Sequence, residues 1–418
     1  MRDDFPSLTT AALCGSLALF IISPLINVGP VNISAFLLLL ASSLWLLQQP
    51  HKWCAYWRQH RHLLLVALLL VGTFWLSNLV NNNTAIVDAT FAQSRWLLLL
   101  TVAAPAVTLG IEPSAWRHIF HFACAVTVAL TAIYCLDTGL YLGFQSNFIL
   151  DLVDAERGDP LRPSWVFNPH PFSRTLIAAL LLLGGAVAIS ARRAVRMICM
   201  LSMLGLSCVL LVGAVRTGLL SLAAMATCVW ILHAHKRVLW GVILGSVLGT
   251  LGLVLRTHIF PQQDPDQSLQ TRGALFEQGI LAFLDKPWIG GGYQAARDIP
   301  WPEHLQTFTA TQTLATTNTH VQWLEMLVSY GLLGGALFVL LWSLWGWFIF
   351  DAQRRATGKF KLPALLLFLN WVSLTLAGFT TVYRESEWAL WVVTILGTAW
   401  LVQHQGAPEE SRRKTGDS

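Results

Sequence analysis

Long apolar runs separated by short polar segments set the pattern of this chain. Most runs have about 18 to 25 residues, the length that a helix needs to cross the hydrocarbon core of a bilayer. We expect about twelve such helices, at residues 11–28, 31–48, 62–79, 94–110, 116–136, 171–190, 196–213, 216–232, 237–256, 321–350, 362–380 and 388–403. The predicted fold is therefore an all-α, polytopic membrane protein, with residues 1–418 in a single helical domain.

Two polar segments, residues 137–170 and 257–320, are much longer than the other connections. The second separates the ninth and tenth expected spans. Within it, Thr271–Asp285 has apolar residues at helical spacing and predicts an amphipathic helix that lies along the membrane surface. Pro287 ends this helix, and Gly290-Gly291-Gly292 predicts a flexible turn. The apolar residues are Leu275, Phe276, Ile280, Phe283 and Leu284.

Composition excludes an ordinary soluble domain. The chain is 55% hydrophobic and 12% charged, whereas soluble domains have about 25% charged residues. The net charge of +5 does not indicate a nucleic-acid partner, because most of the basic residues lie in the terminal segments and in short connections between the expected spans. We read them as orientation signals next to membrane lipids.

Lysine and arginine are distributed unevenly between the two sides of the expected bundle. Of the 27 basic residues, 17 lie in the terminal segments and one set of short connections, although the alternate set contains both of the longest segments. The positive-inside rule therefore places both termini in the cytoplasm and residues 257–320 on the outer face.

Ionisable residues are scarce near the centres of the expected spans. They gather at the outer ends, and this group comprises Asp137, Arg174, Arg216, Arg256, Arg272, His320, Arg384, Glu385 and Glu387. Ion-coupled transporters usually place charged residues at mid-membrane. The distribution favours chemistry at the outer membrane surface over transport through the bundle.

His320 is the candidate catalytic base. It follows Thr319, which is expected to cap the next span in a capping-box pattern with Gln322. A helix N-terminus disfavours the imidazolium and keeps the ring able to accept a proton. The alternatives are a capping or surface histidine without catalytic function, or a base at His170 or His304, which lie in connections without an evident scaffold.

Three arginines are candidates for binding an anionic substrate. Arg216 stands at the outer start of a span. There it either faces an aqueous cavity, with helix N–H donors beside it, or extends to the membrane surface as an anchor for the span. Arg272 is in the first turn of the expected amphipathic helix and could reach the same anion, or be an ordinary polar-face residue. Arg384 is a weaker candidate, because its neighbours Glu385 and Glu387 could pair with it.

No metal or cofactor is expected. Asp264-Pro265-Asp266 has the spacing of a nucleotide-sugar metal motif, but we interpret it as a turn. The sequence has no His/Cys cluster with metal-ligand spacing. It also has no Gly-Lys-Ser/Thr phosphate loop and no Gly-x-Ser-x-Gly elbow.

Three segments in order give the chain a family resemblance. They are Arg216-Thr217-Gly218, the turn Pro287-Trp288-Ile289-Gly290-Gly291-Gly292 after Arg272, and a His-x-x-x-Leu element with two later glycines, here His320, Leu324, Gly331 and Gly334. The family's usual asparagine after the histidine is Val321 here. With these motifs the chain resembles the O-antigen ligase and polymerase superfamily, and among its members the O-antigen ligases of Gram-negative bacteria.

The resemblance implies a glycosyltransferase of the bacterial inner membrane with its active site on the periplasmic face. Its donor would be a glycan on undecaprenyl diphosphate, its acceptor lipid A–core, and its reaction metal-independent and inverting. His320 would be the base, Arg216 and Arg272 would act on the diphosphate, and Arg384 and Gln322 would contact substrate. The alternatives are an O-antigen polymerase, a protein O-oligosaccharyltransferase or, in another class, a glycolipid flippase.

Overall fold

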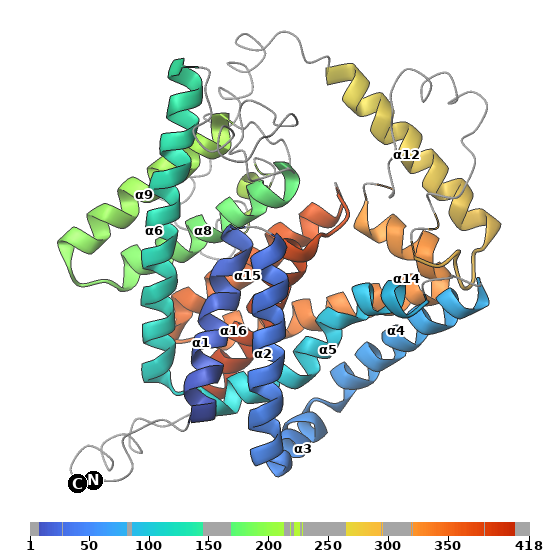
Figure 1. Ribbon diagram of the computed structural model, residues 1–418, viewed down its shortest axis with the longest axis horizontal. Helices are drawn as coiled ribbons and strands as arrows, with labels where there is room; N and C mark the ends of the chain where they lie inside the picture. The colour runs from blue at the N-terminus through green and yellow to red at the C-terminus, as the bar shows by residue number, and fades with distance from the viewer. Residues whose placement is uncertain are drawn as a thin grey trace.

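The computed structural model describes residues 8–26, 28–81, 86–144, 169–212, 218, 221–225, 228, 265–293, 295, 319, 321–379 and 381–405. Every regular element in these ranges is a helix, which confirms the all-α prediction (Figure 1). The α-helices are α1 Leu8–Ile22, α2 Val28–Gln48, α3 Pro50–Gln59, α4 Arg61–Val80, α5 Ile86–Gly110, α6 Pro113–Phe144, α8 Pro169–Ile189, α9 Arg193–Val212, α12 Pro265–Asp285, α14 Gln322–Arg355, α15 Lys361–Gly378 and α16 Glu385–Gln405. Short 3₁₀ turns follow α1 at Ser23–Leu25 and precede α15 at Gly358–Phe360.

Seven helical segments in the described part of the chain are long and apolar enough to cross a membrane, and two shorter apolar stretches lie at Ser94–Gly110 and Ser173–Ile189. The polytopic class is therefore confirmed, and the count of twelve stays a prediction. The expected spans 216–232 and 237–256 lie largely outside the described residues.

Helix boundaries differ from the expected spans where local signals outweigh hydropathy. The expected span 11–28 is not one helix, because α1 ends at Ile22 and Pro24 lies in the 3₁₀ turn that follows. Four helices, α3, α6, α8 and α12, begin at a proline. Proline has no backbone N–H and suits the first helical position, where an N–H would have no intrahelical partner. The short α3 was not expected at all, since it is polar overall and has only Tyr56 and Trp57 buried.

The helices pack in three neighbouring groups (Figure 1). Helices α6, α8 and α9 contact one another on one side, and on the other side α4 and α12 each contact α14. Between them lie α1, α2, α5 and α16, with α15 joining α14 to α16 and α8. This arrangement brings the C-terminal end of α4 and the N-terminal ends of α8, α14 and α16 toward the same end of the bundle, which we call the site end.

Helix α14 is broken at Gly331, which has φ 64° and ψ −168°. In an unbroken helix the N–H groups of Leu332 and Leu333 would donate to the carbonyls of Val328 and Ser329. They donate instead to the carbonyls of Pro287 and Trp288, at 2.7 and 3.4 Å. The break therefore leaves two carbonyls in need of donors.

The glycine turn supplies those donors. The N–H groups of Gly291 and Gly292 donate to the carbonyls of Val328 and Ser329, each at 2.9 Å. Four backbone groups freed by the break thus pair with residues 287–292, and we call this arrangement the glycine junction. These residues form the predicted turn, with positive φ at Gly290 and Gly292. The prediction that the turn is flexible is wrong, because hydrogen bonds hold it at both ends and breaking them would leave backbone groups without partners.

The end of α4 fastens the same turn from its other side. The Ser77 hydroxyl donates to the carbonyl of Ser329 at 2.7 Å, and the Asn81 amide donates to the carbonyl of Gly290 at 2.9 Å. Asn78 Oδ1 accepts the N–H of Tyr293 at 2.8 Å. Polar side chains at the end of α4 therefore complete the glycine junction.

Replacing Gly331 with alanine is expected to lower the unfolding temperature of the purified protein. A Cβ there would lie 2.3 Å from the carbonyl carbon of Trp288, and the backbone conformation is one that only glycine adopts readily, at a cost of about 1–3 kcal/mol for other residues. Gly72→Ala in α4 is the matched control, because a Cβ there meets no atom within 4 Å. Equal unfolding temperatures for the two variants would contradict the role of the break.

Candidate functional site

The start of α14 is held by a buried carboxylate. Glu325 Oε2 accepts hydrogen bonds from the N–H of Thr319 at 3.0 Å and from its hydroxyl at 3.2 Å, and Oε1 accepts from the Ser329 hydroxyl at 3.4 Å. Thr319 and Glu325 are both buried. The carboxylate therefore fixes the residue that precedes His320 in the sequence.

The predicted capping box at this helix is wrong. The N-cap is Val321, which has an extended backbone and makes no side-chain cap. Thr319 lies two residues earlier, and its reciprocal partner is Glu325 rather than Gln322. The carboxylate of Glu325 reaches back to a residue six positions earlier, before the N-cap. The capping-box pattern pairs residues only three positions apart and does not describe this contact.

Gln322 joins the start of α14 to the turn between α15 and α16. Its N–H donates to the carbonyl of Thr381 at 3.1 Å, and its side-chain oxygen accepts the N–H of Tyr383 at 2.8 Å. The side chain is 1% exposed. Its observed function is to fix α14 on the C-terminal side of His320, and a contact between Gln322 and substrate stays a prediction.

Helix α12 packs against the start of α14. A Cβ at Gly279 would lie 2.6 Å from Leu324 Cδ2 and 2.9 Å from Thr319 Cγ2, so a larger residue there would displace these side chains. The helix begins at Pro265, six residues before the expected start at Thr271. Arg272 belongs to it, two helical turns before Gly279, and its side chain lies outside the described residues.

The apolar residues of α12 are divided between two faces rather than gathered on one. Leu275 and Ala282 are buried, and Ala282 packs with Leu324 and Val328 of α14, whereas Phe276, Ile280 and Leu284 are exposed. Trp288, just after the helix, is 72% exposed. The exposed face suits the expected position at a membrane surface, and that position stays a prediction.

The start of α16 carries a cluster of charges that we call the α16 cluster: Arg95, Arg174, Arg384, Glu385 and Glu387. Glu387 Oε2 accepts the N–H of Arg384 at 2.7 Å and its Oε1 pairs with Arg174 of α8. Arg95 of α5 pairs with Glu385 at 3.1 Å. The predicted pairing of Arg384 with its neighbours holds for its backbone N–H only, since its side chain is exposed and forms no ion pair with either glutamate.

The first motif approaches this cluster through its glycine. A Cβ at Gly218 would lie 3.0 Å from the Cβ of Ser173, the residue before Arg174. Gly218 follows Arg216 by two residues. Arg216, His304 and His320 themselves lie outside the described residues, as does the side chain of His170.

The site end thus brings together parts of all three motifs. Gly218 packs on α8, α8 is ion-paired to α16, and the turn before α16 is bonded to Gln322 of α14. The glycine junction joins residues 287–292 to the same helix α14. Sequence reasoning missed Glu325 and Arg174 as partners in this arrangement. Helical spacing could not have found either pairing, because Glu325 bonds to a residue outside its helix and Arg174 to one 213 positions away.

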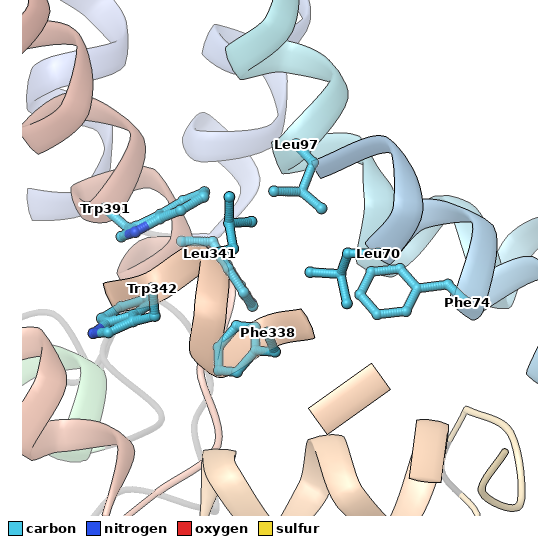
Figure 2. A pocket seen from close by; sticks show the side chains of 8 residues that line it. Leu70, Phe74, Leu97, Phe338, Leu341, Trp342 and Trp391 are labelled. Atoms are coloured by element: carbon cyan, nitrogen blue, oxygen red, sulfur yellow. The ribbon is translucent and has the colours of Figure 1, made fainter. Parts of the chain in front are cut away.

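A small apolar cavity lies in the bundle between α4, α5, α14 and α16 (Figure 2). Phe338, Trp342 and Trp391 face Leu70 and Phe74 across it. The rings of Trp342 and Trp391 stack with centroids 5.9 Å apart. The cavity has no polar group to orient a ligand, and we assign it to the packing of the core.

The fold and the site end define a multi-pass helical membrane protein with polar and charged groups collected at one end of the bundle. Comparison with known families is consistent with this class. Residues 171–339 match the model of the family described as O-antigen ligase.

Over these residues the chain is similar to that family, which confirms the resemblance found in the motifs. The matched region begins in α8, contains Arg216, Arg272 and His320, and ends beyond the break in α14. No curated protein matched the chain.

Proposed function

We propose that this protein is an O-antigen ligase. It transfers O-antigen polysaccharide from undecaprenyl diphosphate to lipid A–core on the periplasmic face of the bacterial inner membrane. The observation that carries the proposal is the family match over residues 171–339, which includes all three motif segments. The family supports a lipid-linked glycan transferase in general, and the ligase reaction with these two substrates is the proposal.

Arg216 and Arg272 bind the donor diphosphate in this proposal. A guanidinium is always charged and matches the geometry of a phosphate. As the glycosyl bond breaks, negative charge develops on the leaving diphosphate and the two arginines stabilise it, an effect typically worth about 3 kcal/mol per donor group. Arg384, whose exposed side chain stands at the start of α16, is the further candidate for contact with substrate.

His320 removes the proton from the acceptor hydroxyl. The oxygen then attacks the anomeric carbon, the bond to the diphosphate breaks, and the proton remains on the imidazole. Direct displacement inverts the configuration at that carbon. The bonds of Glu325 to Thr319 and of Gln322 to Thr381 and Tyr383 support this assignment, because they fix the chain one residue before and two residues after His320.

The glycan that accumulates without the protein separates a ligase from a polymerase. A deletion strain of a ligase is expected to accumulate full-length polymer on the lipid carrier, because polymerisation continues and transfer stops. Single repeat units on the carrier would show a polymerase instead. Complementation with the wild-type chain is the control, and it is expected to restore polymer on lipid A–core.

A further inference from the structure

Arg174 has an unused hydrogen-bonding edge. Its side chain is 1% exposed, and its Nη1 donates to Glu387 Oε1. Its Nε and Nη2 atoms are buried and have no partner among the described residues. Leaving a buried donor unpaired is unfavourable, so we expect a guanidinium held in this way to bind an acceptor.

The geometry of the free atoms indicates what that acceptor is. Nε and Nη2 lie along one side of the guanidinium and present parallel N–H groups, the fork that binds two oxygens of a phosphate or carboxylate. Glu387 occupies Nη1 and leaves this fork free. The ion pair therefore orients the arginine without using the edge that is best suited to an oxyanion.

The position of Arg174 points to the donor as the source of that oxyanion. Ser173, its neighbour in α8, is packed against Gly218, two residues after Arg216. Glu387, its ion-pair partner, also accepts the N–H of Arg384. The residue before Arg174 thus packs against the glycine of the motif that contains Arg216, and the ion-pair partner of Arg174 also binds the backbone of Arg384.

We propose that the free edge of Arg174 binds a phosphate of the lipid-linked diphosphate donor. This inference rests on the proposed function, because it takes the donor's chemistry from it. Arg174 then acts as a third guanidinium for the diphosphate, and Glu387 is the residue that orients it.

The test measures the binding of undecaprenyl diphosphate to the full-length protein in nanodiscs. Arg174→Lys keeps the charge and the pairing with Glu387 but removes the fork, and is expected to weaken binding roughly 10-fold to 100-fold. Arg355→Lys is the control, because Arg355 pairs with Asp351 at the C-terminal end of α14, outside the α16 cluster, and is largely exposed. Its effect is expected to stay within about twofold.

Two further measurements make every outcome decisive. Glu387→Gln keeps an acceptor for Arg174 and removes a competing negative charge, so it is expected to tighten diphosphate binding. Weaker binding by that variant would overturn the inference, even if Arg174→Lys fails to fold. The second measurement repeats the binding assay with lipid A–core, and a loss of affinity confined to that lipid would overturn the assignment to the donor.

The outcome for the wild-type protein separates this inference from the proposed function. If the wild-type chain binds undecaprenyl diphosphate and Arg174→Lys binds it equally well, only the inference fails. If the wild-type chain binds neither lipid, the proposed function fails with it.

Discussion

Replacing His320 with alanine is expected to abolish glycan transfer and to leave donor binding intact. A general base contributes roughly 10²-fold to 10⁴-fold to the rate, and alanine has no group that can take the acceptor proton. The arginines that bind the diphosphate are unchanged in this variant. The measurements are the initial rate of transfer and the affinity for undecaprenyl diphosphate, both with purified protein.

His404→Ala is the control for that variant. His404 lies near the C-terminal end of α16, where its ring stacks on Trp400, far along the helix from the α16 cluster. Its replacement is expected to leave the rate of transfer unchanged. A near-normal rate for His320→Ala would place the base elsewhere, and His170→Ala and His304→Ala would then be compared in the same assay.

Glu325→Ala is expected to lower kcat about 100-fold with little change in the KM for the donor. The variant removes the acceptor of the Thr319 N–H and hydroxyl, so the chain before His320 loses its attachment to α14. A displacement of about 1 Å in a catalytic group can cost about 10²-fold in rate. Donor binding depends on other residues in the proposed mechanism, which is why the effect falls on kcat.

The conservative variant distinguishes positioning from charge. Glu325→Gln retains an oxygen that accepts from Thr319 and is expected to recover most of the rate. Gln353→Ala, another buried polar residue near the opposite end of α14, is the control for general damage to the helix. The positioning role would be rejected if Glu325→Gln were as slow as Glu325→Ala, or if Gln353→Ala slowed transfer equally.

Hydropathy predicted the class of fold because the length and apolar character of each run can be read without knowing what the run packs against. The helices around Arg61–Val80 and Gln322–Arg355 follow directly from the length of their apolar runs. The amphipathic segment after Thr271 was also found, because helical spacing is a local signal. The division of its apolar residues between two faces was not, since it depends on the contact with α14.

The features that a sequence pattern could not supply are contacts between distant segments. Gly290–Gly292 looks like a hinge by composition, and only the break at Gly331 shows what its N–H groups bind. Ser77 reaches a carbonyl 252 positions away. Such pairings depend on how the helices pack, which local spacing does not specify.

The residues of the candidate site were likewise predictable only in part. The motifs predicted His320, Arg216 and Arg272 because the residue types and their order are typical of the superfamily. The groups that hold the neighbouring chain, Glu325 above all, have no motif of their own. Arg174 was noted as one of the charged residues at the outer ends of the spans, and its pairing with Glu387 appears only in the folded chain.

The central claim is that this chain transfers a lipid-linked glycan, and a reconstituted assay tests it most directly. Purified protein is placed in liposomes that hold undecaprenyl diphosphate-linked polymer and lipid A–core on the same side, in the presence of EDTA. We predict that polymer becomes attached to lipid A–core at the rate seen without EDTA. Failure to transfer polymer under any condition would contradict the transferase function. Activity that is lost in EDTA and restored by magnesium would contradict the metal-independent mechanism.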